Sequence, residues 1–249
     1  MTQPQSALAV VQPDMSYKEV RQVFEPQPFY LKTFQANQLK NVGLSIYAGE
    51  SAQIKVEVSG PAHLVDQIEI SESRMVSWVQ VTGPYNDQGD SIFNIFADPV
   101  ENPPYMPLVQ IVVVVPEKTA ITLNKVQGII HVDNIDGNLS LALGGEFYAV
   151  IGKMNEAKVS LMGKGEVVID SVKKLAKIDM VGETVLSINH GSVYSLIIDT
   201  DGAASCAYQG SAVNGSLTAR GKSTIHATQL SNHPQVERDA DATIIYGRV

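Results

Sequence analysis

The chain has 249 residues, of which 44% are hydrophobic and 18% charged, with a formal net charge of −8 at pH 7 and an isoelectric point near 5.1. These proportions are typical of a soluble globular protein. Lysine and arginine form no cluster, which excludes the basic footprint of a nucleic-acid-binding protein. The longest clean apolar run, Ile111–Val115, has the length of a strand and is far shorter than the roughly 20 residues of a membrane helix. We therefore expect neither a nucleic-acid partner nor a membrane span.

Residues 1–28 are predicted to comprise an N-terminal arm, rich in Gln and Pro, and a short helix. Ser16 to Glu19 reads SYKE, which matches a capping box and predicts a helix that extends to about Phe24. The segment lacks the basic region and the long apolar run of a secretory signal peptide. The default expectation is therefore a cytoplasmic protein, or one that reaches the surface after processing or by another route. The arm supplies three candidate partner-binding residues, which could add as a strand to another subunit: Leu8, Val10 and Val11.

Residues 29–116 are predicted to form an antiparallel or mixed β cap layer, because apolar and polar residues alternate along several short stretches. A long loop, residues 83–107, interrupts this layer and contains five of the twelve prolines. Loops of this length are commonly functional or disordered. Its aromatic side chains either fold back on the core or form a partner-binding surface, and the candidates for the second role are Tyr85, Phe93, Phe96 and Tyr105.

Residues 117–249 are predicted to form a parallel β-solenoid with a C-terminal capping strand. Eleven of the twelve prolines lie at or before Pro116, and the next is Pro234, which leaves room for an uninterrupted sheet. Within this interval, pairs of apolar residues separated by one residue recur every eight to eleven residues, and such a near-constant period indicates a solenoid. Few turns carry the Asn-Gly or Asp-Gly signature of an antiparallel hairpin. Two strands per coil would require roughly 19 residues and three roughly 28, since each strand and turn takes about nine.

Aspartates at the strand ends raise the question of a cation site. Asp133 and Asp136 lie in the turn sequence DNIDG, where a carboxylate can accept hydrogen bonds from the turn backbone. We expect strand-end capping rather than metal binding. His131 and His226 occupy outward positions on their strands, without the spacing of a zinc site. Cys206, the only cysteine, is expected to be a buried structural thiol.

No catalytic motif is present. The sequence NGSLTARGKST has five residues between Gly215 and Gly221, where a phosphate-binding loop needs four. A serine nucleophile elbow is also absent. We therefore predict no cofactor, no metal and no enzymatic activity.

The segment from Phe29 to Gly60, FYLKTFQANQLKNVGLSIYAGESAQIKVEVSG, followed by Leu64–Val65 and Met75–Val81, resembles the auto-transporter adhesin head family of bacterial β-solenoids, the GIN-domain family. Val115–Leu139, VPEKTAITLNKVQGIIHVDNIDGNL, resembles the start of that family's repeats. The resemblance covers about residues 29–230. It implies a right-handed parallel β-helix, often on secreted or surface-anchored proteins, and no established catalytic residues. A more distant resemblance is to the bactofilins, which are cytoskeletal β-helices.

Three functions are compatible with these features of the sequence. The first is a structural protein that associates with itself, as a homo-oligomer or filament, or scaffolds partners through its N-terminal arm and strand edges. The alternative is a surface adhesin or glycan-binding module. A carbohydrate-active enzyme is the third, and it would need two carboxylates at catalytic separation on one face.

Overall fold

The computed structural model describes residues 16–25, 33–73, 78–83 and 107–248. The described chain is mostly β, with one four-residue helix, α1 (Ala62–Val65), and one mixed, open sheet of thirteen strands. No helix in these ranges is long and apolar enough to cross a membrane. The strands are β1 Tyr17–Phe24, β2 Thr33–Asn37, β3 Val42–Gly49, β4 Ile54–Pro61, β5 Glu69–Ser73, β6 Trp78–Thr82, β7 Val109–Pro116, β8 Ala120–Val132, β9 Asn138–Gly202, β10 Ser205–Ala219, β11 Thr224–Leu230, β12 Gln235–Arg238 and β13 Thr243–Arg248.

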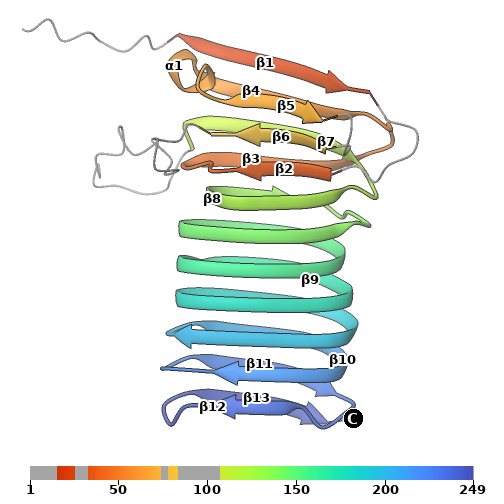
Figure 1. Ribbon diagram of the computed structural model, residues 1–249, viewed down its shortest axis with the longest axis vertical. Helices are drawn as coiled ribbons and strands as arrows, with labels where there is room; N and C mark the ends of the chain where they lie inside the picture. The colour runs from red at the N-terminus through yellow and green to blue at the C-terminus, as the bar shows by residue number, and fades with distance from the viewer. Residues whose placement is uncertain (1–15, 26–32, 74–77, 84–106, 249) are drawn as a thin grey trace, which may run out of the picture.

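From β8 onward the chain coils, and each coil pairs in parallel with the next (Figure 1). Paired residues lie 18 positions apart for Ile121 and Leu139, 19 for Cys206 and Ile225, and 20 for Val185 and Ser205. A coil of about 19 residues matches the two-strand alternative predicted from the sequence. We call Ala120–Arg248 the coiled region.

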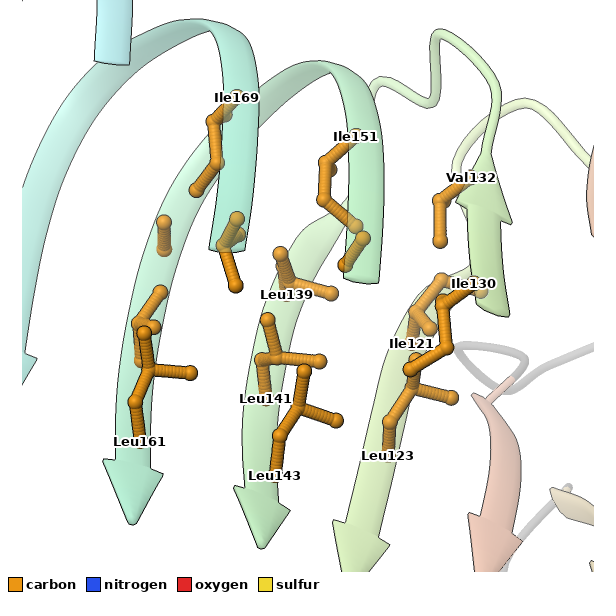
Figure 2. Packing of buried hydrophobic residues seen from close by; sticks show 14 of the residues in the cluster. Ile121, Leu123, Ile130, Val132, Leu139, Leu141, Leu143, Ile151, Leu161 and Ile169 are labelled. Carbon is orange, nitrogen blue, oxygen red and sulfur yellow. The ribbon is translucent and has the colours of Figure 1, made fainter. Parts of the chain in front are cut away.

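The core lies between the two layers of each flattened coil. Figure 2 shows Leu139, Leu141 and Leu143 on one layer, pointing toward Ile151 and its neighbours on the other. All four side chains are at most 3% exposed, and their spacing by two residues follows the alternation of faces along a strand. Burial of one such side chain contributes roughly 1.5–3 kcal/mol. The repeated apolar pairs of the sequence are therefore the stacked layers of this core.

Glycines form a column at one edge of the coiled region, because successive coils approach too closely there for a side chain. A Cβ on Gly182 would lie 2.6 Å from the carbonyl oxygen of Gly163, and the φ of Gly182 is +98°. Only glycine adopts such a backbone at low cost. The column consists of Gly145, Gly163, Gly182, Gly202 and Gly221, all with positive φ.

The N-terminal end differs from the coiled region. β2, β3, β6 and β7 continue its parallel pairing, whereas β1 and β5 pair antiparallel with β4 and β6, and β4 also runs antiparallel to β7. The layer is therefore mixed, one of the two predicted arrangements.

The helix predicted from Ser16 to Phe24 is wrong, because this segment is strand β1. Its backbone pairs with β4 along its whole length, and the register sets Val20 opposite Val58 and Phe24 opposite Ile54. Val20 and Phe24 pack on the core from these positions. Tertiary pairing with an open strand edge outweighs the local preference of a capping box. The helix that does occur, α1, contacts β1 and β4.

Candidate functional site

A pocket of about 410 Å³ opens on the outer face of the sheet where the N-terminal strands meet the coiled region. We call it the junction pocket. Strands β2, β5, β6 and β8 supply its wall, because β2 lies between β6 and β8 and β5 lies beside β6. Its lining residues are Asn37, Gln38, Glu69, Ser71, Gln80, Thr82 and Asn124.

The strand register brings these residues together from distant parts of the sequence. Asn37 pairs with Thr82 on one side and with Asn124 on the other, and Thr82 pairs in turn with Glu69. Alternation along each strand turns these side chains outward, while Val81, between Gln80 and Thr82, faces the core. The lining residues therefore form one continuous polar area on the outer surface of the sheet.

The lining is polar and carries no positive charge. Four residues are amides and two carry hydroxyl groups, while Glu69 is the single carboxylate. The Nε2 of Gln80 donates a hydrogen bond to the Oγ1 of Thr82 at 2.6 Å, which fixes the orientation of that amide. Amides and hydroxyls can both donate and accept hydrogen bonds. The pocket can thus bind a neutral ligand that has several hydroxyl groups, and it offers no cation to an anionic ligand.

The backbone around the junction pocket is strained. Among the described residues, three that are not glycine have positive φ: Gln38 at 55°, Asn41 at 53° and Lys125 at 54°. Gln38 lines the pocket, and Lys125 follows the lining residue Asn124. The N–H of Gln38 donates to the carbonyl oxygen of Asn124 at 2.9 Å, which ties the two strand ends together. Left-handed backbone at residues other than glycine is costly and is concentrated at functional sites.

The partner-binding residues predicted from the sequence all lie outside the described residues: Leu8, Val10, Val11, Tyr85, Phe93, Phe96 and Tyr105. The junction pocket was not predicted. The sequence did carry a signal, since TFQAN places polar residues at alternate positions around a central glutamine, and WVQVT places Gln and Thr at such positions after Trp. That signal becomes a site only through the pairing of strands β2 and β6.

The aspartates of the turns bind backbone and basic groups. The Oδ1 of Asp133 accepts a hydrogen bond from the N–H of Asn134 at 2.7 Å, as strand-end capping predicts. Lys173 donates to the Oδ1 of Asp136 at 2.7 Å, and this hydrogen bond together with the positive charge lowers the pKa of Asp136. No group of three His, Cys, Asp or Glu side chains in the described ranges is arranged to hold a metal ion.

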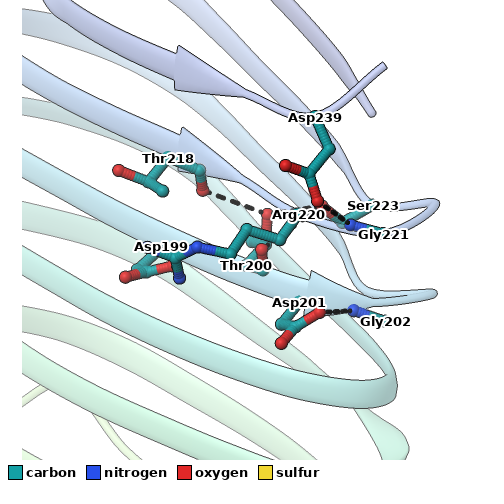
Figure 3. A network of polar contacts seen from close by, with 9 residues as sticks. All are labelled: Asp199, Thr200, Asp201, Gly202, Thr218, Arg220, Gly221, Ser223 and Asp239. Carbon is teal, nitrogen blue, oxygen red and sulfur yellow. Dashed lines mark hydrogen bonds and ion pairs between the residues drawn. The ribbon is translucent and has the colours of Figure 1, made fainter. Parts of the chain in front are cut away.

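The same pattern recurs near the C-terminal end of the coiled region, as Figure 3 shows. Arg220 donates to the Oδ1 of Asp199 at 2.8 Å, and the N–H of Gly221 donates to Asp239 at 3.1 Å. Inside the coil, the hydroxyl of Thr200 donates to Ser223 at 2.9 Å. These polar contacts join adjacent coils, so they have a structural role.

Cys206 is buried, as predicted, with 1% of its surface exposed. Burial raises the pKa of its thiol to about 12, which disfavours the nucleophilic thiolate. His131 and His226 are exposed on the outer face. Tyr47 lies beside His131, with ring centroids 5.6 Å apart.

Comparison with known proteins shows similarity of fold. No family model matches the sequence, and no curated protein matches it. The structure is similar to that of a "putative adhesin" from Bacteroides fragilis, with a TM-score of 0.61 and 14% identity over 94% of this chain and 99% of that one. It is also similar to "putative adhesin" structures from Parabacteroides merdae (TM-score 0.48, 11% identity, 96% and 98% covered) and Parabacteroides distasonis (0.46, 12%, 94% and 98%). The chain thus shares the mostly β fold of the Bacteroides protein over nearly its full length.

Proposed function

We propose that this protein is a non-enzymatic, adhesin-like binding module that holds a neutral glycan in the junction pocket. The observation that carries the proposal is the lining itself, in which amide and hydroxyl groups surround one carboxylate and no basic side chain is present. Sugar hydroxyl groups donate and accept hydrogen bonds at once, and the amides of Asn37, Gln80 and Asn124 offer both functions. A volume of about 410 Å³ lies in the range of small-ligand sites.

Trp78 adds an apolar element beside this polar area. It occupies the same face of β6 as Gln80, two residues earlier, and it is half-buried. An indole ring combines a large apolar surface with one N–H donor. Trp78 therefore supplies a surface for the apolar face of a sugar ring that extends beyond the pocket.

The carboxylate count supports binding rather than hydrolysis. Glycoside hydrolases of the usual type need two carboxyl groups that flank the scissile bond. Among the lining residues, Glu69 is the single carboxylate. A carbohydrate-active enzyme is therefore the weaker hypothesis for this site.

The adhesin name of the similar Bacteroides structure favours the second function considered from the sequence, a surface adhesin, over self-assembly. We also propose that the chain is a right-handed parallel β-solenoid of the GIN-domain type that displays its site to a cell-surface partner. The parallel pairing at intervals of about 19 residues supports the solenoid. The handedness is taken from the family resemblance and stays a prediction.

A glycan array followed by calorimetric titration of the bound sugars tests the proposal. One lost neutral hydrogen bond weakens binding by about 0.5–1.5 kcal/mol, so Asn124→Ala should raise Kd about 2- to 12-fold. Asn138→Ala is the matched control, because Asn138 is also an exposed asparagine on the next coil and does not line the pocket. Glu69→Gln tests whether the carboxylate takes part. If no neutral glycan binds, or if both asparagine variants weaken binding equally, the proposal is wrong.

A further inference from the structure

The last strand of the coiled region has an open edge. β13 pairs in parallel with β11, and no other described strand pairs with it. It forms the lower end of the stack, near the C-terminus (Figure 1). An unpaired strand edge presents a row of free N–H and C=O groups that can pair with another chain.

The side chains of β13 do not protect this edge. Its first five residues, TIIYG, include no charge and no proline, and Ile245 is 55% exposed on the outer face. The opposite end of the molecule is different, since Lys18, Glu19 and Arg21 lie on β1 and Arg21 forms an ion pair with Glu57 at 3.1 Å. Charged edges resist pairing with other chains, whereas flat apolar edges promote it. The uncharged part of β13 is therefore better suited than β1 to pair with another chain.

The apolar interior of the last coil is also partly exposed. Val236 on β12 pairs with Leu217, which is fully buried, yet Val236 is 42% exposed. On β13, Ile244 and Tyr246 lie opposite the buried Ile225 and Ala227 and are only partly covered. A second layer against this end would bury apolar surface as well as pair backbone groups.

The direction of the hydrogen bonds between β13 and β11 determines which backbone N–H and C=O groups of β13 point to the open edge. The N–H of Thr243 donates to the carbonyl oxygen of Ser223 at 3.0 Å, so Thr243 faces β11. Successive residues of a strand point their backbone groups to opposite sides. Ile245 therefore faces β11 too, and the N–H and C=O groups of Ile244 and Tyr246 point to the open edge; beyond Tyr246 the pairing with β11 is irregular.

We infer that β13 is a self-association site at which a second copy of this chain adds antiparallel about a two-fold axis through Ile245. In this register Ile244 lies opposite Tyr246 of the second copy, and the two residues exchange both backbone hydrogen bonds, as an antiparallel hydrogen-bonded pair does. Both pairs also bring apolar side chains together over the open core. The strand is thus complementary to itself, which is the requirement for an isologous two-fold interface. This inference does not rest on the glycan site.

The mass of the intact chain in solution, measured by light scattering over a wide range of protein concentrations, gives the first test. The mass should rise from 26.9 kDa toward twice that value and stop there, because a two-fold interface closes. Ile245→Lys should hold the mass at one chain. The control is Val185→Lys, since Val185 is 42% exposed on the outer face of β9 and pairs with Ser205 on the following coil, away from the open edge. That variant should associate like the unmodified chain.

Cysteine crosslinking tests the register itself. Ile245→Cys places two cysteines directly opposite in a non-hydrogen-bonded pair, about 4.5 Å between Cα atoms, within reach of a disulfide. Thr243→Cys is the control, because its copies would be separated by four residues, about 14 Å. The buried Cys206 does not compete. With an added oxidant, the Ile245 variant should form a covalent dimer and the Thr243 variant should not. A monomer at all concentrations, growth beyond two chains, or equal crosslinking of both variants would overturn the inference.

Discussion

Replacement of Gly182 by alanine is the sharpest test of how the coils stack. The φ of +98° is unfavourable for any residue with a side chain, at a cost of about 1–2 kcal/mol. The new Cβ would also lie 2.6 Å from the carbonyl oxygen of Gly163, so two coil backbones must separate locally. Overpacking of this kind costs about 1–3 kcal/mol. We expect Gly182→Ala to lower the free energy of unfolding by about 3 kcal/mol in total.

Gly144→Ala is the matched control. Gly144 lies in the same coiled region, its φ is not in the left-handed range, and the nearest atom to its added Cβ is the carbonyl oxygen of Met162 at 4.0 Å. There the loss of unfolded-state entropy should leave stability unchanged or raise it by about 0.5 kcal/mol. Thermal and denaturant unfolding, followed by circular dichroism, should show Tm lower by about 6–12 °C for Gly182→Ala. Equal stability of the two variants would refute close backbone stacking along the glycine column.

Two further predictions concern buried polar groups. The Oγ1 of Thr184 is buried and has no hydrogen-bond partner in the described structure, whereas that of Thr200 donates to Ser223. In a denaturant titration, Thr184→Val should leave the free energy of unfolding unchanged or raise it by up to about 1 kcal/mol. Thr200→Val should lower it by about 1–2 kcal/mol. The reverse order of the two variants would contradict these contacts. Burial raises the pKa of Cys206 from its ordinary 9.0 to about 12, so the unfolded chain loses this proton at lower pH than the folded one. The stability contributed by the neutral thiol is complete below pH 9 and is lost as pH rises toward 12, and in alkaline melts Cys206→Ala should lose less stability over that window than the unmodified chain.

The coiled region could be predicted from the sequence because one local rule generates it. Each pair such as Leu139 and Leu141 alternates with polar residues, and the same pattern returns one coil later at Val159 and Leu161. Each strand pairs with the equivalent strand of the next coil, which is close in the sequence, so the pattern can be recognised locally. The number of strands per coil did need the structure, since about nine residues per strand fit either alternative and only the pairing of Ile121 with Leu139 decides between them.

The structure of the N-terminal end could not be predicted from a local pattern in the sequence. β1 has a helical start signal at Ser16 but lies against β4, and its conformation depends on an edge supplied nearly forty residues later. The junction pocket depends on pairing over still longer distances, because Asn37 meets Asn124 across 87 positions. Polar residues at alternate strand positions are common, and only this register gathers Glu69 beside them.

The position of the junction pocket also favours a functional role. The coiled region changes direction at glycines such as Gly182, where positive φ is inexpensive. Beside the pocket the chain instead uses Gln38 and, within the coiled region itself, Lys125 in left-handed conformations, each of which costs about 1 kcal/mol or more. Glycine at these positions would serve the backbone equally well. Gln38 lines the pocket, so a left-handed residue other than glycine forms part of the pocket wall. This placement supports the proposed binding site.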